Sequence, residues 1–307
     1  MRILLTGGAG FIGSNLADAL IADGHHLAIL DNLSTGRVEN VPSEAEFIEL
    51  DILSSKVEDV IRQGRFDALF HYAAQIEVRT SVADPLTDVR VNVAGSVALL
   101  EFAKRYGIPR FYFASTGGVI YGEQDYFPAD ENHPLRPQSP YAVAKASVEK
   151  YMYYYWKVFG ITAIALRYGN VFGPRQNPFG EAGVIAIFCR RMLDRKTAFI
   201  NGDGLTTRDY VYISDVVRAN LAAIQLDGFH IFNIGTGIET DVLTIYDALN
   251  RLTGAAAPRN HKPAPPGEQR RSCIDSGLAK RVMEWKPEVS FDDGLKRTVD
   301  YFKTRTR

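Results

Sequence analysis

Residues 6–13 of this 307-residue chain decide its fold: they read Thr6-Gly7-Gly8-Ala9-Gly10-Phe11-Ile12-Gly13. This glycine-rich stretch follows the apolar run Ile3–Leu5 and opens a helical pattern over Phe11–Ala22. One glycine permits a tight turn, a second lets the backbone approach a pyrophosphate, and a third allows the helix to pack closely on the strand. The start of the helix adds free N–H groups and the positive end of a dipole. The stretch therefore predicts a dinucleotide-binding loop rather than a simple tight turn.

Short apolar runs continue to alternate with helical patterns through the first half of the chain. Strands are expected at Ile3–Leu5, Leu27–Leu30, Phe47–Leu50, Ala68–Phe70, Phe111–Phe113 and Ile161–Leu166, and helices at Phe11–Ala22, Thr87–Tyr106 and Pro140–Phe159. Such alternation indicates a parallel sheet covered on both faces. We therefore expect an α/β protein with a Rossmann-type doubly wound parallel sheet.

The pattern changes after Gly173, where prolines and glycines mark a loop. Helices are expected at Val184–Asp194 and Asp292–Lys303, and the Pro-rich stretch Pro258–Gly267 is expected to be a loop. We expect a dinucleotide-binding domain over residues 1–167 and a smaller C-terminal substrate-binding domain over residues 168–307. The segment from 209 to 237 is expected to return to the first sheet.

Composition narrows the class of protein further. Apolar residues make up 46% of the chain, and 35 Lys and Arg against 36 Asp and Glu give a net charge of −1. That balance argues against binding to nucleic acid or to anionic membranes through bulk charge. The two cysteines, Cys189 and Cys273, form no CxxC, and the histidines show no spacing of metal ligands, so no metal is expected. Glycines follow Met1 too early for a signal peptide, and no apolar run is long enough to span a membrane, so a cytoplasmic protein is expected.

An acidic residue stands at the end of the second expected strand. Asp31 follows the glycines by about 20 residues, where a carboxylate accepts the hydroxyls of the adenosine ribose and repels a 2′-phosphate. Asn32 and Leu33 come next rather than an arginine, which favours NAD over NADP. The alternative role for Asp31 is a helix cap or a solvated loop residue. Asp51-Ile52, after the third strand, is a weaker candidate for the adenine edge.

A tyrosine and a lysine share one face of the helix expected over Pro140–Phe159. Ser139 and Pro140 suit the N-cap and N1 positions, which places Tyr141 and Lys145 at i and i+4. Tyrosine is a poor base because its ordinary pKa is about 10. We expect the Lys145 ammonium and a cationic nicotinamide to lower the pKa of Tyr141, so that its phenolate can take a proton. A YxxxK pattern alone also arises by chance; here it follows a nucleotide loop and Ser115.

These residues, taken in order, resemble the extended short-chain dehydrogenase/reductases, and among them the NAD-dependent sugar-nucleotide epimerases and dehydratases. The resemblance runs over essentially the whole chain and rests on residues 6–13, His71-Tyr72-Ala73-Ala74, Asn92-Val93-Ala94-Gly95, Tyr121-Gly122, Tyr141-x-x-x-Lys145, Leu166–Pro174, Gly202-Asp203-Gly204, Arg208–Val211, Asn233-Ile234-Gly235 and Gly267-Glu268.

The resemblance implies reversible epimerisation at C4 of a UDP-hexose with tightly held NAD. Tyr141 would exchange a proton with the 4-hydroxyl, hydride would pass between C4 and NAD, and Lys145 would hold the nicotinamide ribose. The cofactor-binding residues are expected to be Gly7, Gly10, Phe11, Ile12, Gly13, Asp31, Asn32, Asp51, Ile52, Ala73, Ala74, Gln75, Asn92, Tyr141, Lys145, Tyr168 and Val171.

One departure from the family concerns the catalytic hydroxyl. The family usually carries Ser or Thr four residues before the tyrosine of the Tyr-Gly pair, and here that position is Gly117. Thr116 is expected to take the role, with Ser115 second. The 4,6-dehydratases carry an acidic pair, and the decarboxylases a glutamate, where this chain has Gly118 and Val119. Neither residue moves protons, so the resemblance favours redox chemistry at C4 over elimination or decarboxylation.

The substrate-binding residues implied by the resemblance are Asn170, Val184, Phe199, Arg208, Arg271 and Ser272. Arg208 is expected on the diphosphate, where a planar guanidinium suits phosphate, unless it forms a surface ion pair with Asp203 or Asp209. The family often has a second arginine where this chain has Pro265. Arg270 or Arg271 would compensate, or would form solvated ion pairs.

Two further expectations concern the sugar and the assembly. Ser272 occupies a position that borders the sugar's 2-substituent in the family, and its small size predicts tolerance of N-acetylated hexoses. The mostly aromatic residues 151–156 lie on the helix that carries Tyr141. They either pack in the core or contribute to a four-helix interface like that of the family, and we expect a homodimer. The alternatives to UDP-hexose epimerisation are another sugar-nucleotide enzyme, such as a net oxidoreductase or a UDP-glucuronate 4-epimerase, and a nucleotide-binding sensor without turnover.

Overall fold

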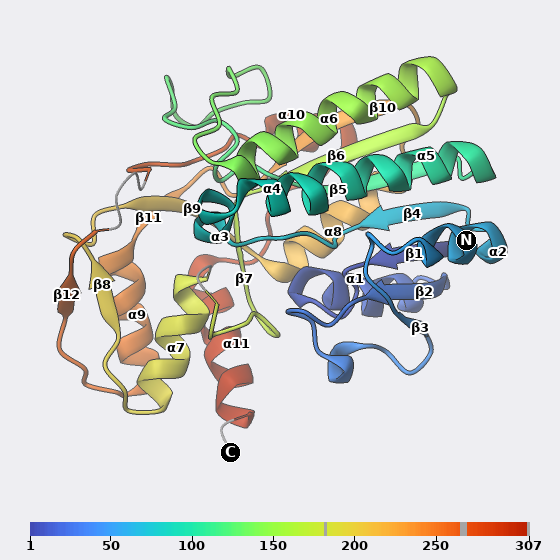
Figure 1. Cartoon of the computed structure of the whole chain (residues 1–307). Coiled ribbons are helices and arrows are strands. Elements are labelled where there is room, and N and C mark those ends of the chain that lie inside the picture. Colours follow the sequence, from blue (N-terminus) through green and yellow to red (C-terminus); the bar gives the residue numbers. More distant parts are fainter. Residues whose placement is uncertain (181–182, 265–268, 306–307) are drawn as a thin grey trace. The chain divides into compact units, whose positions relative to one another are not determined.

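The computed structural model of the chain describes residues 1–180, 183–264 and 269–305. The chain divides into two compact units, whose elements are labelled in Figure 1. Unit 1 comprises residues 1–116, 137–167 and 217–232, and unit 2 comprises residues 117–136, 168–216 and 233–307.

A seven-stranded sheet, nearly all of it in unit 1, has the order β10-β6-β5-β4-β1-β2-β3. The strands are β1 (Arg2–Thr6), β2 (His26–Asp31), β3 (Glu46–Glu49), β4 (Ala68–His71), β5 (Arg110–Thr116), β6 (Thr162–Tyr168) and β10 (Phe229–Ile234). The pairs β1–β2, β1–β4, β2–β3 and β4–β5 are parallel. This order reverses direction beside β1, as in doubly wound dinucleotide-binding folds, and confirms the predicted fold class.

Helices of unit 1 cover the sheet, and strands such as β4 and β6 are buried along their whole length. These helices are α1 (Phe11–Ala22), α2 (Lys56–Gly64), α3 (Val78–Ala83), α4 (Pro85–Asp88), α5 (Ser96–Tyr106), α6 (Pro140–Phe159) and α8 (Ile213–Ala223), with the short η1 (Val38–Asn40). One core joins Leu4 and Leu69 of the strands to Leu99 of α5 and Met152 of α6. Figure 1 shows α5 and α6 running side by side above the strands.

The helix expected over residues 87–106 has a different geometry from the prediction. Residues Val89–Gly95 form a π-helix, η2, between α4 and α5. A π-turn places an extra residue in each turn, and such turns are frequent at functional sites. The spacing of apolar residues gave no sign of it, because the widened turn is held by polar contacts of Asn92 that are described below.

Unit 2 is built on smaller sheets. Its strands are β7 (Asn170–Phe172), β8 (Phe199–Asn201), β9 (Thr207–Tyr212), β11 (Glu239–Asp241) and β12 (Asn260–Lys262), and its helices are α7 (Val184–Leu193), α9 (Val242–Thr253), α10 (Gly277–Met283) and α11 (Phe291–Thr304). The order β11-β9-β7 forms one sheet, and β12 pairs with β8. The stretch expected to be a loop, Pro258–Gly267, therefore contains a strand; Pro265–Gly267 lie outside the described residues.

Two segments show how the chain passes between the units. Residues 117–136 belong to unit 2, although the sequence placed them in the first domain. The reason is local pairing: Ala129 donates to the Cys273 carbonyl, and Asp275 donates to the Ala129 carbonyl. Of the segment from 209 to 237, residues 217–232 lie in unit 1 and supply its edge strand β10.

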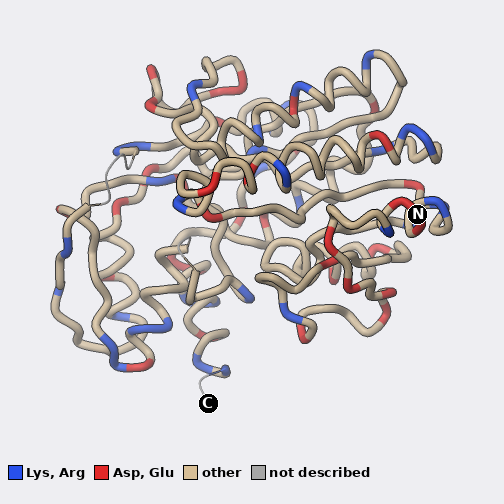
Figure 2. Tube along the Cα trace, in the orientation of Figure 1, with Lys and Arg blue, Asp and Glu red and all other residues tan. Residues whose placement is uncertain are grey.

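Charged residues are spread along the chain in both units, with basic and acidic positions interspersed (Figure 2). Among the described residues, no helix combines the length and the apolar character needed to cross a bilayer. Within the same residues, no cluster of three or more His, Cys, Asp and Glu side chains is arranged to hold a metal ion.

Candidate active site

The glycine-rich loop between β1 and α1 packs so tightly that side chains do not fit. Gly7 has a φ of +73°, and a Cβ there would lie 2.5 Å from the Ala73 nitrogen. A Cβ on Gly13 would lie 2.2 Å from the Gly7 carbonyl oxygen, whereas one on Gly10 would lie 3.2 Å from it. The turn and the helix packing thus require Gly7 and Gly13, while Gly10 leaves its surface open for a ligand.

The N-terminus of α1 carries no cap from a side chain and no acidic residue in its first turn. Its positive end, at Phe11 and Ile12, is therefore available to an anion. Asp31 is 7% exposed and lies beside the loop, where its carboxylate accepts from the Ala9 N–H at 3.0 Å and the Leu33 N–H at 2.9 Å. These two bonds fix the carboxylate and leave lone pairs for a diol.

The remaining candidates for the adenosine end, Asn32, Asp51 and Ile52, lie close to one another. Asn32 donates from Nδ2 to Asp51 at 2.7 Å, and the other oxygen of Asp51 accepts from the Leu53 N–H. Ile52 between them is 7% exposed. The structure thus brings together the side chains after β2 and those after β3, as the parallel sheet predicts.

The segment after β4 lies directly against the glycine loop. Thr6 Oγ1 accepts from the backbone N–H groups of Tyr72 and Ala73 at 3.3 Å. Asn92 of η2 binds the backbone of Gln75 twice, accepting from its N–H and donating to its carbonyl, each at 2.9 Å. Asn92 therefore holds the half-buried segment of Ala73, Ala74 and Gln75 in a single conformation.

Tyr141 and Lys145 lie on one face of α6, as predicted. Ser139 caps the helix by accepting from the Ala142 N–H at 3.2 Å, with Pro140 in the first turn. The Lys145 Nζ donates to the Ala114 carbonyl at 2.9 Å and lies 5.7 Å from the centre of the Tyr141 ring. Among the described residues, nothing hydrogen-bonds the hydroxyl of Tyr141, so it is available to a ligand.

The charge state of this pair differs from the prediction in one respect. Burial lowers the pKa of Lys145 to about 8. Burial, with a smaller contribution from the Asp88 carboxylate, raises the pKa of Tyr141 above its ordinary value. The expected lowering of the Tyr141 pKa is therefore wrong for the protein's own groups: desolvation of the phenolate dominates in this pocket.

Ser115 and Thr116 end β5 and differ in their surroundings. The Ser115 hydroxyl is 4% exposed and donates to Glu149 at 2.6 Å, so it is engaged in a buried network. Thr116 is 9% exposed, and its hydroxyl has no hydrogen-bond partner among the described residues. Gly117 begins unit 2 and donates from its backbone to the Tyr168 carbonyl at 2.7 Å.

Several candidates of unit 2 lie on or next to the sheet β11-β9-β7. Asn170 and Val171 are half-buried on β7, where they pair with Tyr210 and Val211 of β9. The preceding Tyr168 is buried at the end of β6. Val184 is the first residue of α7, and Phe199 opens β8 with 44% of its side chain exposed.

The arginine candidates have protein partners. Arg208 of β9 donates to the Thr207 carbonyl at 2.7 Å. Arg270 forms a bidentate pair with Asp203, at 2.8 and 2.7 Å. Arg271 forms a bidentate pair with Glu239, at 2.9 and 2.6 Å, and stacks on the Phe127 ring. The solvated ion pairs left open by the sequence are thus formed at both 270 and 271.

Ser272 is 2% exposed and directs its hydroxyl at the segment that lacks the usual catalytic side chain. Its Oγ donates to the Gly118 carbonyl at 3.0 Å. Within unit 2 the structure therefore places Ser272, the small residue expected to border the sugar, against the segment Gly117-Gly118, where the chain departs from the family pattern.

Sequence reasoning missed two buried polar residues of unit 1. His71 bridges Thr6 Oγ1 and Ser96 Oγ, each at 2.8 Å, and burial lowers its pKa to about 3. Asp88 is fully buried and accepts from Gln75 and Asn92. A single aspartate carries no sequence pattern that would have indicated this position.

Comparisons with known proteins agree with this arrangement. The model of the NAD dependent epimerase/dehydratase family matches residues 3–235. A UDP-glucose 4-epimerase of Mycolicibacterium smegmatis is 40% identical over 313 residues, covering all of both chains.

Two solved structures are similar over their whole length. One is a UDP-glucose 4-epimerase of Thermotoga maritima with UDP-glucose, at 45% identity and a TM-score of 0.97, covering 99% of both chains. The other is a UDP-glucose 4-epimerase of Thermus thermophilus in complex with NAD, at 41% identity and a TM-score of 0.95, covering 100% of both chains. The chain belongs to the NAD dependent epimerase/dehydratase family.

Proposed function

We propose that this protein is a UDP-glucose 4-epimerase, an isomerase that interconverts UDP-glucose and UDP-galactose. The observation that carries the proposal is the placement of Tyr141 and Lys145 on one face of α6, with Lys145 tied to the end of β5. Full-length similarity to UDP-glucose 4-epimerases at 40–45% identity supports it.

The glycine loop fits NAD. The crowding at Gly7 and Gly13 forms a cradle of bare backbone, and the open N-terminus of α1 suits the pyrophosphate. Asp31 receives the adenosine ribose hydroxyls, and Asn32, Asp51 and Ile52 flank the adenine. When bound, NAD⁺ supplies a hydride acceptor for C4 of the sugar and a positive charge near Tyr141.

Tyr141 holds and moves the proton of the reaction. Its phenolate takes the proton of the sugar 4-hydroxyl as C4 is oxidised, and the phenol so formed returns that proton to the 4-oxygen when the 4-keto sugar, after turning over, is reduced. Because burial raises the Tyr141 pKa, the cations beside it have to favour the phenolate. Lys145 supplies one of these charges and donates to the nicotinamide ribose. Thr116 donates to the same sugar oxygen and replaces the hydroxyl absent at Gly117.

Unit 2 recognises the UDP-sugar. Arg208 binds the diphosphate, Asn170 binds the substrate phosphate or the sugar, and Phe199 lies near the uracil, with Val184 also on the substrate. Ser272 borders the sugar at its 2-substituent; its small side chain leaves room for an N-acetyl group. Arg271 contacts the diphosphate only if the nucleotide displaces it from Glu239.

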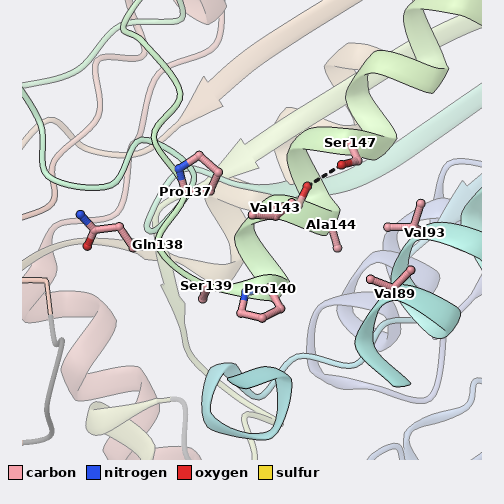
Figure 3. Close-up of a pocket in the computed structure, with 9 residues that line it drawn as sticks. All are labelled: Val89, Val93, Pro137, Gln138, Ser139, Pro140, Val143, Ala144 and Ser147. Carbon is pink, nitrogen blue, oxygen red and sulfur yellow. Dashed lines mark hydrogen bonds between the residues drawn. The ribbon is translucent and has the colours of Figure 1, made fainter. Parts of the chain in front are cut away.

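We also propose that α5 and α6 form the interface of a homodimer. The residues Val143, Ser147, Tyr151, Tyr154 and Val158 follow one another by three or four positions, and the large ones among them are 42–57% exposed. Val143 and Ala144 of α6 and Val89 and Val93 of η2 are among the residues that line an apolar groove of about 580 Å³ (Figure 3). A second copy would cover this stripe in a helix bundle.

The test is conversion of UDP-galactose by the purified protein, with the two nucleotide sugars separated and measured. The proposal predicts approach to a mixture of UDP-galactose and UDP-glucose, and loss of at least about 10³ of the rate in Tyr141→Phe. Turnover of UDP-glucuronate alone would replace the proposal by that epimerase, and binding of NAD without turnover of any UDP-sugar would indicate a sensor.

A further inference from the structure

Asp88 carries a carboxylate that the mechanism above does not use. It is the last residue of α4, immediately before the π-helix η2, and its side chain is fully buried. One oxygen, Oδ1, accepts from Gln75 Nε2 at 3.1 Å and from Asn92 Nδ2 at 2.9 Å. The other oxygen, Oδ2, is buried and has no hydrogen-bond partner among the described residues.

A buried carboxylate held only by two amides needs a positive charge nearby to remain ionised. Burial raises the pKa of Asp88; the hydrogen bonds from Gln75 and Asn92 and the positive charge of Lys145 oppose that rise. In return, Asp88 is the larger of two anions that raise the pKa of Lys145 against its own burial. Asp88 ends α4 just before η2, and both of these helices pack on α6, which carries the buried Lys145; Figure 3 shows Val89 and Val93 of η2 beside α6.

The other groups around Lys145 do not supply a free anion. Glu149, one turn along α6, is bound by Arg167 through both of its oxygens. β5 offers the Ala114 carbonyl and the Phe113 ring, 4.5 Å from Nζ, which favour a cation but carry no charge. His71 of β4 and the Tyr141 phenol are neutral at pH 7, since burial lowers the pKa of the first and raises that of the second.

We propose that Asp88 is a positioning residue of the epimerase: its carboxylate is the buried counter-ion that keeps Lys145 protonated beside Tyr141. This inference rests on the proposed function for its catalytic meaning. Asp88 also raises the pKa of Tyr141, so it acts on the pair in two ways. Asp88 therefore preserves the ammonium form of Lys145. It also opposes ionisation of Tyr141, so the Tyr141 phenolate forms only when the cofactor brings a further positive charge.

The experiment measures the charge of Lys145 directly in the purified protein with its cofactor. Lysine labelled with ¹³C at Cε is titrated by NMR, and the Lys145 signal is assigned with Lys145→Arg. In Asp88→Asn and Asp88→Ser the midpoint of Lys145 is expected to fall by about one pH unit. Using two variants keeps the test decisive if one does not fold. The control is Asp84→Asn, since Asp84 is exposed and caps α4 through the Thr87 N–H.

The pH profile of turnover gives the second readout. The apparent pKa of the alkaline limb of the kcat–pH profile should fall by as much as the Lys145 midpoint in both Asp88 variants. It should stay unchanged in Asp84→Asn. A Lys145 midpoint that does not move in either Asp88 variant overturns the inference, whatever happens to the rate. Failure of the wild-type protein to convert UDP-galactose would instead overturn the proposed function, while the NMR titration would still decide the role of Asp88.

Discussion

Arg167 and Glu149 form a bidentate ion pair in the interior of unit 1. The Arg167 guanidinium donates to the two oxygens of Glu149 at 2.9 and 2.6 Å, and less than 5% of either side chain is exposed. Glu149 lies one turn beyond Lys145 on α6 and also accepts from Ser115 of β5. The pair thus ties α6 to strands β5 and β6.

Glu149→Gln should destabilise the protein strongly, because a neutral amide replaces the carboxylate that balances the buried Arg167 charge. The expected loss in the free energy of unfolding is about 3–5 kcal/mol. Urea unfolding measures it, with Glu46→Gln as the control. Glu46 pairs with Arg2 on the surface, and loss of such a pair changes stability little. Equal losses in the free energy of unfolding for the two variants would show that the buried pair stabilises the protein no more than the surface pair does.

Thr116→Val and Ser115→Ala should separate catalysis from stability. We expect Thr116→Val to lower kcat by about 10²-fold, as loss of one donor to a developing oxyanion does, with stability nearly unchanged. Ser115→Ala should cost about 1 kcal/mol of stability because Glu149 loses a donor, with kcat nearly unchanged. Steady-state kinetics and urea unfolding of both variants test this. The reverse pattern would assign the catalytic hydroxyl to Ser115.

Gly10→Ala should impair NAD binding, whereas Gly13→Ala should impair the stability of the fold. A methyl at 13 would meet the Gly7 carbonyl at 2.2 Å, so Gly13→Ala should unfold the loop and destabilise the protein. A methyl at 10 meets that carbonyl at only 3.2 Å, so Gly10→Ala should keep the fold but block close approach of the pyrophosphate. Thermal unfolding and the NAD content of each protein are the measurements. Full NAD content in Gly10→Ala would contradict the assignment of the loop.

The buried His71 should make stability fall with acid. Its pKa is about 3 in the folded protein and about 6.5 when exposed, so below pH 6.5 the unfolded chain takes up a proton that the folded one refuses. The free energy of unfolding then decreases by about 1.4 kcal/mol per pH unit from this group, down to about pH 3. Urea unfolding at pH 4.5 to 7 measures how steeply the free energy of unfolding depends on pH. In His71→Gln this slope should be smaller by the contribution of one proton. Parallel slopes would refute the prediction.

Association through α6 should depend on its exposed stripe. The wild-type protein is expected to sediment at twice the monomer mass, and Tyr154→Glu should shift it to the monomer because a charge would be buried in the interface. Tyr153→Glu is the control and should remain dimeric, because Tyr153 lies on the side of α6 that packs on Phe229 of β10. A monomeric wild-type protein at micromolar concentration would exclude this interface.

The sequence predicted the parts of the site that depend on local patterns. The loop of residues 6–13, Asp31 after β2 and the Tyr141–Lys145 spacing follow from strand, turn and helix geometry, and the structure places each on the expected element. The strand order around β1 follows from the same alternation.

What could not be predicted depends on contacts between distant segments. In the π-helix η2, Asn92 bonds to Gln75, 17 residues earlier, and apolar periodicity carries no record of that bond. The raised pKa of Tyr141 arises from burial, which only the packed structure reveals. The pairing of Arg271 with Glu239 likewise joins residues 32 positions apart.

The most direct test of the central claim uses UDP-galactose carrying deuterium at C4 and no added nicotinamide. If Tyr141 and tightly held NAD act as proposed, the protein forms UDP-glucose that keeps the deuterium at C4, because the same hydride leaves and returns within one site. ¹H NMR of the product measures this retention. Loss of deuterium to solvent, or a requirement for added nicotinamide in stoichiometric amounts, would contradict epimerisation by transient oxidation and indicate a different reaction.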